Sequence, residues 1–370
     1  MKIYNLPHIS FDYIQGNDIK NHIVDEELFK KIINKKGEID SVQYKWDSAK
    51  KISNDYEYIF TSSKYYKNIS SIIPVSRSFF KLREIIYDFQ LTIDNNVSCI
   101  AEAPGGFIQS ILKFIKERNI KSIKSINSIT LVSNNIDIPY WNNLVINNSL
   151  VKICNGEDGT GDIYKSKNII NYIKFCGKYS CSFITADGGF DYTTNFEQEL
   201  SSYKLFINEI IITLHIQSKG GTFICKLFDL FWYSTLQLVF ILYLSYEKIS
   251  FIKPYTSRQS NSEKYIICQG YKGYNTNINN LLFRHFENKE NECLPIKLPD
   301  KFIELINSYH RQFINNQINR IDNTLHIINQ RRNLDKPSKQ QIDYAIHWCK
   351  KYKIPINKAC IYLKNNYNYN

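Results

Sequence analysis

Four charged side chains have residue types and positions suited to moving a proton. Lys226 interrupts an otherwise apolar segment, where a lysine is rarely buried without a partner. Asp187 directly follows another apolar segment, and Glu263 stands at the mouth of a third. Because parallel strands present their carboxyl ends at one edge of a sheet, these residues are predicted to converge on one cleft with Lys81. By itself, Lys81 reads as an ordinary surface lysine.

A glycine turn between a strand and a helix is the second candidate site. Residues 97–101 are typical of a buried strand, and residues 107–115 repeat apolar side chains at helical spacing. Glycines let backbone N–H groups approach a ligand closely, but the turn does not match GxGxxG, so a dinucleotide fingerprint is not met. An acidic Glu102 favours a cationic ligand that carries an amino acid, such as S-adenosyl-L-methionine. An ordinary tight turn explains the pattern equally well. The candidate ligand-binding residues are Glu102, Ala103, Pro104, Gly105, Gly106 and Phe107.

Two further polar residues extend this candidate site. Residues 129–133 are predicted to form the second strand, and Asn134 follows directly. In doubly wound nucleotide folds this position binds a ribose hydroxyl, which a side-chain amide can do. Asp162, in the glycine-dense loop 156–163, is placed to accept a hydrogen bond from an adenine amino group. A solvated turn is an equally good explanation of Asn134.

Composition excludes several classes of protein. A hydrophobic content of 43% in 370 residues is too high for a disordered chain. The net charge of +12 favours a polyanionic partner such as nucleic acid, although solubility alone also explains it. Nine scattered cysteines without a CxxC pair indicate reduced thiols in an intracellular protein, not a disulfide framework or a zinc site. No signal peptide and no metal-ligand cluster are recognised, so neither secretion nor a metal is expected.

The order of segments predicts the architecture. Strands and helices alternate from residue 97 to residue 270, which predicts an α/β fold with a mostly parallel sheet. Residues 227–246 are long and apolar enough to cross a bilayer, but polar residues dilute them, so a helix packed on the sheet is predicted instead. Residues 275–294 are the expected linker. Residues 295–370 are predicted to form a helical extension with a net charge of +8, which either binds RNA or exposes a solvated basic face. Its basic residues include Arg331, Arg332 and Lys350 to Lys353.

Several motifs, in order and at the right spacing, resemble those of one family. They are residues 76–81 (SRSFFK), 102–107 (EAPGGF), 160–163 (TGDI), 186–191 (ADGGFD), 221–226 (GTFICK) and 261–265 (NSEKY). The chain is thereby similar to the FtsJ-like RNA 2'-O-methyltransferases, most of all to the Adrift-type branch that methylates mRNA caps. Residues 46–51 (WDSAKK) and 56–61 (YEYIFT) resemble that branch as well. The likeness covers about residues 46–274.

The resemblance implies a fold, a cofactor and a set of roles. The fold is the Rossmann-like, doubly wound sheet of class I methyltransferases, and the methyl donor is S-adenosyl-L-methionine on the turn 102–107. Lys81, Asp187, Lys226 and Glu263 are the implied catalytic tetrad. Lys226 is its general base, Lys81 steers the hydroxyl, and Asp187 lies between donor and lysines. Burial and a second ammonium are expected to lower the pKa of Lys226, whereas Asp187 and Glu263 oppose this shift. Asn134 or Asn135 stands where many family members place a carboxylate on the ribose.

These observations lead to one expected function and two alternatives. We expect methyl transfer to the ribose 2'-hydroxyl of the first transcribed nucleotides of capped mRNA. The alternatives are methylation of ribosomal or transfer RNA, and a basic RNA- or cap-binding subunit without catalysis. Capped mRNA and other capping enzymes are the expected partners, and no membrane is expected. The expected compartment is the cytoplasm for a large cytoplasmic DNA virus and otherwise the nucleus. The predicted division is an N-terminal segment (1–45), a methyltransferase domain (46–274), the linker and the extension.

Overall fold

The computed structural model describes residues 3–11, 14–16, 19–189, 198–288, 293–330 and 336–364. Within these residues, the centre of the molecule is an eight-stranded sheet with the strand order β1-β8-β9-β7-β6-β3-β4-β5. The five strands from β7 to β5 run parallel, whereas β9, β8 and β1 each pair antiparallel with their neighbour. The predicted α/β class with a mostly parallel sheet is confirmed. The strands are β1 (Ile3–Asn5), β3 (Asn96–Ile100), β4 (Ser125–Ile129), β5 (Val151–Ile153), β6 (Cys181–Ala186), β7 (Gln217–Leu227), β8 (Tyr246–Ile252) and β9 (Lys264–Tyr271).

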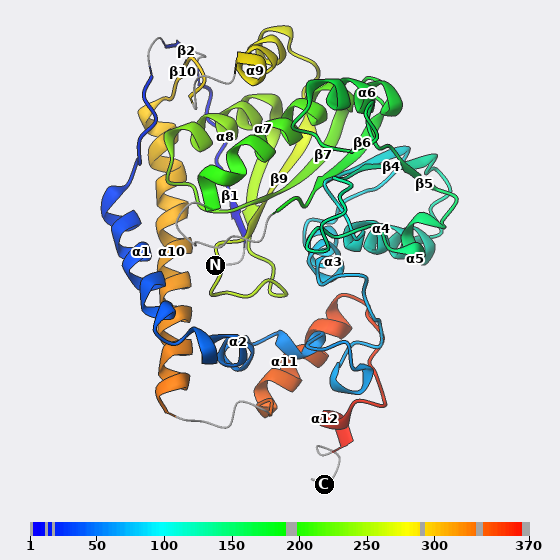
Figure 1. Ribbon diagram of the computed structural model, residues 1–370, viewed down its shortest axis with the longest axis vertical. Coiled ribbons are helices and arrows are strands. Elements are labelled where there is room, and N and C mark those ends of the chain that lie inside the picture. Colours follow the sequence, from blue (N-terminus) through cyan, green and yellow to red (C-terminus); the bar gives the residue numbers. More distant parts are fainter. Residues whose placement is uncertain are drawn as a thin grey trace.

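The two faces of the sheet bury different side chains, because side chains alternate along a strand. On β7, Phe223 and Cys225 pack with α6 (Ser166–Cys176), α7 (Gln198–Ile216) and α8 (Tyr233–Ser245). Ile224, between them, packs with α3 (Ser78–Asp88) and α4 (Gly106–Arg118) on the opposite face. Helices therefore cover both faces, as in a doubly wound fold, and Figure 1 shows α6, α7 and α8 across one of them.

The predicted position of the second strand is wrong. We expected a strand over residues 129–133, whereas β4 ends at Ile129. Residues 125–129 carry only two apolar side chains, Ile126 and Ile129, and this shorter run pairs in parallel with β3 and β5. Asn134 consequently lies five residues beyond the strand, in the irregular segment before α5 (Asn143–Ile146). The apolar pair Leu131–Val132 misled the prediction, because its side chains lie in the loop after the strand.

The helix predicted within residues 227–246 is confirmed as α8. Its residues are buried nearly all round, with Gln237 bonded to backbone groups of residues 294 and 296. A helix that is apolar on every side belongs in a protein core or a membrane. In the described part of the chain, none of the helices has the length and apolar character that crossing a bilayer requires.

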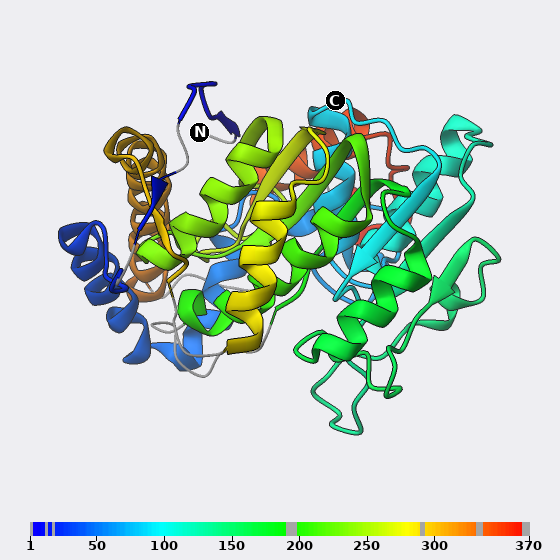
Figure 2. The same ribbon diagram turned by 90° about the horizontal axis from the view of Figure 1, so that it is seen from above.

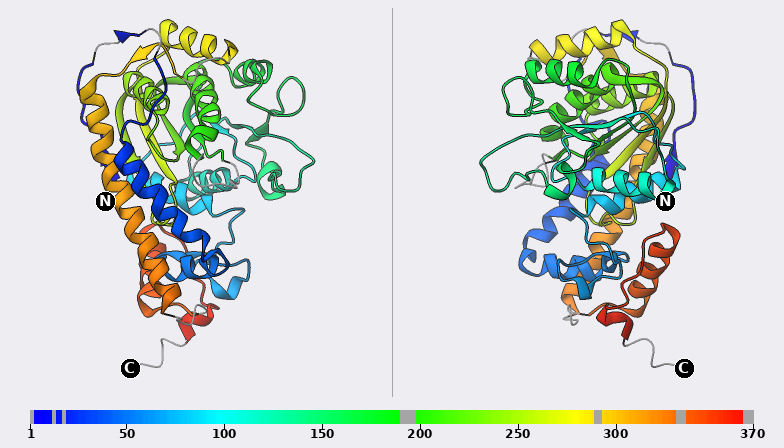
Figure 3. Two further views of the ribbon diagram at one scale, coloured as in Figure 1. Left: turned by 60° about the vertical axis from the view of Figure 1, so that its left-hand side comes forward. Right: turned by 90° about the vertical axis from the view of Figure 1, so that its right-hand side faces the viewer.

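A second layer of helices lies beside and below the sheet in Figure 1. The long α10 (Asp300–Asn329) runs along α1 (Glu26–Asp40) and α2 (Gln43–Ile52), as Figures 1 and 3 show. Its Tyr309 stacks on Phe251 of β8 with ring centroids 4.5 Å apart. The remaining pieces are α9 (Thr276–Asn288), α11 (Lys339–Lys351), α12 (Ile361–Lys364), the short helices η1 (Glu57–Ile59) and η2 (Tyr65–Lys67), and the small β2 (Ile14–Gln15) and β10 (Ile296–Lys297) pair.

The C-terminal helices pack on the rest of the structure. Trp348 of α11 contacts Phe80 of α3, and these residues share an apolar cluster with η1. The expected linker contains α9, which packs against α7 and is the yellow helix in Figure 2. The basic residues Arg331 and Arg332 lie outside the described residues. The division into domains and RNA binding by the extension stay predictions.

Candidate active site

The register of the sheet brings the predicted site residues to one edge. Ile100 of β3, Ala186 of β6 and Cys225 of β7 are consecutive partners across three parallel strands. One or two residues further on, Glu102, Asp187 and Lys226 therefore emerge at the same carboxyl edge. Because β9 runs the other way and Tyr265 pairs with Lys226, the start of β9 brings Glu263 to this edge too.

Lys81 and Glu263 form a buried ion pair. The Lys81 Nζ atom lies 2.8 Å from Glu263 Oε2, and each side chain is at most 15% exposed. Lys81 comes from α3, which packs on the same face of the sheet to which Glu263 points. Burial alone raises the pKa of Glu263, but Lys81, Lys226 and Lys253 outweigh it and bring the pKa down to about 2. Glu263 is therefore an anion at every pH at which the chain is expected to work.

Lys226 and Asp187 are held together at the neighbouring strand ends. The Lys226 Nζ atom donates to the backbone oxygen of Asp187 at 2.7 Å and lies 3.6 Å from its Oδ1. The Tyr265 hydroxyl donates to that same Oδ1 at 2.8 Å. Gly189 leaves the space that the lysine needs, because a Cβ atom there would lie 2.7 Å from Nζ. All four predicted catalytic side chains thus meet at one edge of the sheet.

The expected shift of the Lys226 pKa is wrong in direction. Burial does lower the pKa of Lys226, but Asp187, Glu263, Glu209 and Glu102 together raise it above its ordinary value. The prediction set burial and a second ammonium against Asp187 and Glu263, and it did not count Glu209 and Glu102. Without a bound cation, Lys226 is an ammonium at neutral pH.

Backbone anchors fix the loop that ends at Glu263. Lys253, buried at the end of β8, donates to the backbone oxygens of Asn261, at 2.8 Å, and of Glu263. At the other end of the loop, the backbone N–H groups of Tyr255 and Thr256 donate to Glu84, at 2.7 and 3.3 Å. Glu84 lies on α3 three residues after Lys81, so one helix positions both the lysine and the loop that carries its partner.

Glu84 also ties this loop to the C-terminal part of the chain. Its Oε2 atom accepts a hydrogen bond of 3.0 Å from the indole N–H of Trp348 on α11. Arg83 beside it donates to the backbone oxygen of Tyr352 at 3.0 Å. The C-terminal helix α11 therefore supports the helix on which Lys81 stands.

The glycine turn has the backbone geometry that a close-fitting ligand needs. Gly105 has a φ of +106°, which side chains rarely adopt, and α4 begins at Gly106. Glu102 Oε1 accepts a hydrogen bond of 2.6 Å from the N–H of Phe107, in the first turn of α4. The other oxygen, Oε2, is buried and has no hydrogen-bond partner in the described part of the chain.

The charge at this turn suits a cationic ligand. Burial, together with the nearby charge of Asp187, raises the pKa of Glu102 well above its ordinary value. Two carboxyl groups that compete in this way are stabilised by a positive charge placed beside them. A methyl donor with a sulfonium and an ammonium group meets that requirement, so the turn fits S-adenosyl-L-methionine.

The two outer residues of the predicted donor site lie in different surroundings. Asp162 Oδ1 accepts from the N–H of Tyr164 at 2.8 Å and so closes a turn. Gly161 beside it lies against the end of β4, because a Cβ atom there would be 1.9 Å from the backbone oxygen of Thr130. Asn134 is exposed. Their contacts with an adenosine stay predictions.

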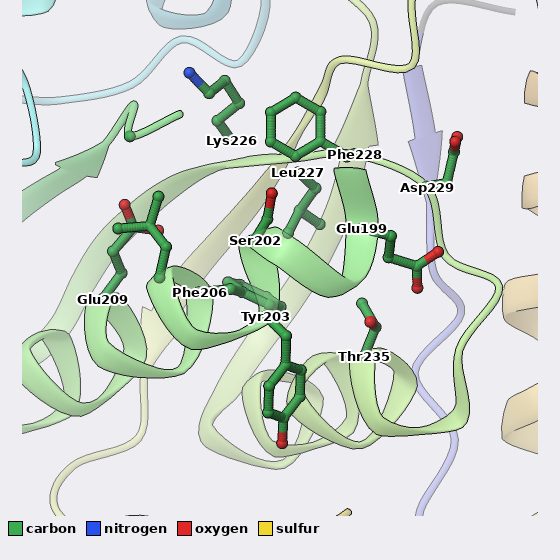
Figure 4. A pocket seen from close by; sticks show the side chains of 12 residues that line it. Glu199, Ser202, Tyr203, Phe206, Glu209, Lys226, Leu227, Phe228, Asp229 and Thr235 are labelled. Atoms are coloured by element: carbon green, nitrogen blue, oxygen red, sulfur yellow. The ribbon is translucent and has the colours of Figure 1, made fainter. Parts of the chain in front are cut away.

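A small cavity lies on the other side of Lys226, between α7 and α8. Its volume is about 20 Å³, which is room for one water molecule and too little for a ligand. Figure 4 shows the amine end of Lys226 pointing away from α7, the helix that carries Glu199, Tyr203 and Glu209. The ammonium group of Lys226 therefore lies at the sheet edge and not in this cavity.

The sequence profile of the FtsJ-like methyltransferase family matches residues 74–271. This match covers more than half of the chain and all four tetrad positions. The chain belongs to the FtsJ-like methyltransferase family. The predicted family resemblance is confirmed.

Curated relatives narrow the likeness to one branch of FtsJ-like methyltransferases. The cap-specific mRNA (nucleoside-2'-O-)-methyltransferase 1 of Xenopus laevis is 37% identical over 133 residues, which cover 35% of this chain and 16% of that protein. The Homo sapiens protein of the same name is 38% identical over a stretch of the same length and coverage. The Trypanosoma brucei brucei protein of that name is 32% identical over 177 residues, 47% of this chain and 46% of that protein. The matches span less than half the length of each relative.

Sequence reasoning missed several residues of this FtsJ-like site. Tyr265 was within a recognised motif, but nothing in the sequence indicated that its hydroxyl would meet Asp187. Lys253 stands at a strand end before a proline, the same kind of position that singled out Asp187. Glu57 and Arg258 form an ion pair of 3.0 Å, but they are far apart in sequence and their pairing depends on the tertiary fold. Of these residues, only Lys253 could have been found from the sequence, because it stands at the end of a predicted strand.

Proposed function

We propose that this chain transfers a methyl group from S-adenosyl-L-methionine to the ribose 2'-hydroxyl of the first transcribed nucleotides of capped mRNA. The observation that carries the proposal is the convergence of Lys81, Asp187, Lys226 and Glu263 at one sheet edge beside the glycine turn. A 2'-hydroxyl must lose a proton as it gains a methyl group, and this cluster holds two lysines for that proton and its developing charge.

The donor would be held by the chain from Glu102 to Phe107, with its adenosine near Asp162 and Asn134. When bound, S-adenosyl-L-methionine supplies a methyl group on a positively charged sulfur, which makes the carbon an electrophile. A cation between Glu102 and Asp187 lowers the pKa of Lys226, because it weakens the attraction of those carboxylates for the ammonium. Donor binding and activation of the base are therefore coupled through Asp187.

Lys226 acts as the general base. Its neutral Nζ atom would accept the proton of the 2'-hydroxyl as the ribose oxygen bonds to the methyl carbon and the bond from that carbon to the sulfur breaks, which leaves the sulfur uncharged. Lys81, fixed by Glu263 at 2.8 Å, steers the hydroxyl and stabilises its growing negative charge. Asp187 keeps the amine of Lys226 in place through its backbone oxygen, and Tyr265 fixes the carboxylate of Asp187. A bound metal ion has no role in this scheme.

Capped mRNA is proposed as the substrate because relatives that match 35–47% of this chain are cap-specific by name. Ribosomal or transfer RNA is the alternative substrate within the FtsJ-like family. Other capping enzymes as partners, and the nucleus or cytoplasm as compartment, stay predictions.

The decisive experiment incubates the chain with methyl-labelled donor and one RNA sequence in capped and uncapped forms. We expect label on the capped RNA, at the ribose of the first or second nucleotide after nuclease digestion. Label on uncapped structured RNA alone would contradict the cap assignment and support methylation of ribosomal or transfer RNA instead. Binding of RNA without any transfer would indicate a non-catalytic subunit.

A further inference from the structure

A buried carboxylate joins two arginines at the border of the active site. Glu57, in η1, is fully buried, and its Oε1 atom accepts from Arg77 at 3.3 Å and from Arg258 at 3.0 Å. Its Oε2 atom accepts from Nε of Arg258 at 3.2 Å and from the amide of Asn54 at 2.8 Å. Arg258 is thus bound by both oxygens, which fixes the plane of its guanidinium group.

This arrangement keeps Glu57 charged. Burial by itself raises the pKa of Glu57, but Arg77, Arg258 and Asn54 outweigh burial and hold the pKa below its ordinary value. Two arginines around one carboxylate leave a net charge of +1. The carboxylate therefore orients the arginines without cancelling their charge.

Both arginines keep hydrogen-bond donors for something else. Each side chain is 27% exposed, although Arg77 is also held by the backbone oxygens of Phe60 and Thr256. Neither Nη1 of Arg258 nor Nε of Arg77 bonds to another residue in the described part of the chain. A guanidinium group with one edge fixed by protein and another edge open is prepared for an anion.

The pair stands beside the reacting groups. Arg77 precedes Lys81 by about one helical turn, and Arg258 lies in the loop that ends at Glu263. The charges of both arginines act on Glu263. Tyr56, next to Glu57, stacks on Tyr255 of the same loop with centroids 4.6 Å apart, which holds η1 against that loop.

We propose that Arg77 and Arg258 form a phosphate site for the RNA backbone beside the acceptor ribose, and that Glu57 is the positioning residue of this site. The inference rests on the proposed function, because it takes RNA as the acceptor. The planar fork of arginine matches two oxygens of a phosphate, and a phosphodiester adjoins every ribose of the chain.

The variant Glu57→Gln distinguishes a positioning role from a purely electrostatic role, because the two roles predict opposite changes in RNA binding. If only charge mattered, removing an anion would tighten RNA binding. If Glu57 orients the arginines, we expect KM for RNA to rise about tenfold, as for loss of a charge-assisted hydrogen bond, with kcat at saturating RNA changed less. Glu304→Gln, an exposed site on α10, makes the same charge change and should not raise KM. A folded Glu57→Gln protein with unchanged or lower KM would overturn the positioning role.

Arg258 provides a test that does not depend on the buried carboxylate. Arg258→Lys keeps the charge and loses the fork, whereas Arg258→Gln loses both. We expect both to raise KM for RNA, and only Arg258→Gln to reduce the slope of log binding constant against log salt, by about 0.7 for one phosphate on a single strand. Equal slopes in wild type and Arg258→Gln would contradict the phosphate contact.

Binding assays separate this inference from the proposed function. Filter binding of a short single-stranded RNA over a salt series needs no methyl transfer. An arginine-dependent slope without any methylation would support the phosphate site and remove the methyltransferase proposal. Methylation with KM values independent of Arg77, Arg258 and Glu57 would do the reverse. Circular dichroism and donor affinity should match the wild type in every variant scored.

Discussion

Two clusters of buried charges lie on opposite faces of the same strand ends, and only one of them can reach a substrate. Glu263 and Lys264 are neighbours at the start of β9, so their side chains point to opposite faces. Glu263 pairs with Lys81 near Lys226 and Asp187, and these four side chains are 11–15% exposed. Lys264 turns to the other face, where its side chain is fully buried.

The second cluster is centred on Asp229, just after β7. Asp229 Oδ2 lies 3.1 Å from Lys36 of α1, and Oδ1 lies 3.8 Å from Lys264 and 3.9 Å from His310 of α10. The Lys264 ammonium also lies over the ring of Phe313, 4.0 Å from its centroid. Helices α1 and α10 each contribute one of these partners, and Figure 3 shows the two helices side by side. Similar residue types are thus enclosed where helices cover them and stay partly exposed where the edge of the sheet is open.

The largest effect is expected from a substitution in the open cluster, which consists of Lys81, Asp187, Lys226 and Glu263. Lys226→Ala should lower turnover by about 10²–10⁴-fold, the range for loss of a general base, and leave donor binding nearly intact. Single-turnover methylation and calorimetric donor titration measure the two quantities. Lys248→Ala removes an exposed lysine from the adjacent β8 and serves as the matched control. Loss of donor binding in Lys226→Ala would assign this lysine a structural role instead.

The second-largest effect is expected from a substitution in the closed cluster, which is the buried cluster centred on Asp229. Asp229→Asn should reduce the free energy of unfolding by about 3–5 kcal/mol, because it leaves buried cations without their partner. Turnover per folded molecule should stay near the wild-type value. Urea unfolding of Asp229→Asn, with the exposed Asp343→Asn as control, measures the first quantity. A small loss of stability with a large loss of turnover would erase the difference between the two clusters.

The closed cluster should also make stability depend on pH. Burial lowers the pKa of His310 to about 4, against the effect of Asp229. Between about pH 4 and 6.5 the unfolded chain binds a proton on this histidine that the native chain does not, so stability falls as pH falls through this window. Lys36, His310 and Lys264 hold the pKa of Asp229 below its ordinary value despite burial, so its contribution is lost only in stronger acid.

His310→Gln isolates this effect from other titrating groups. Glu199, whose pKa burial raises to about 7, works in the opposite direction over an overlapping window and is present in both proteins. We expect the difference in unfolding free energy between pH 7 and pH 4.5 to shrink in the variant. An identical pH dependence in both proteins would show that His310 does not titrate with unfolding.

The smallest expected effect concerns the pH dependence of kcat/KM, which depends on the charges of the open cluster. Because the carboxylates raise the pKa of Lys226, kcat/KM for RNA should rise with pH into the alkaline range. Burial raises the pKa of Glu209 to about 8, so Glu209 adds to this effect only above that pH. Glu209→Gln should therefore follow the wild-type profile below about pH 8 and exceed it above. A difference already present at pH 7 would mean that Glu209 is ionised there.

Local pattern predicted much of the site and failed where distant groups add up. Lys226 was recognisable because one charged residue stood in an apolar strand, and Asp187 because it followed one. The predicted direction of the Lys226 pKa shift was wrong, because four carboxylates from four segments act on this lysine. The predicted end of β4 was wrong as well, because hydrophobicity alone did not distinguish the strand from the loop that follows it.

The alternation of strands and helices, the glycine turn and the strand-end positions of Asp187, Lys226 and Glu263 were set by the sequence itself, because each is encoded within a few neighbouring positions. The tertiary structure alone decided which face each charge occupies, that Glu84 and Lys253 hold the loop of Glu263, and that Glu57 gathers two arginines. Those outcomes depend on contacts between residues up to two hundred positions apart. Periodicity describes a single element, whereas a charge is stabilised by every element around it.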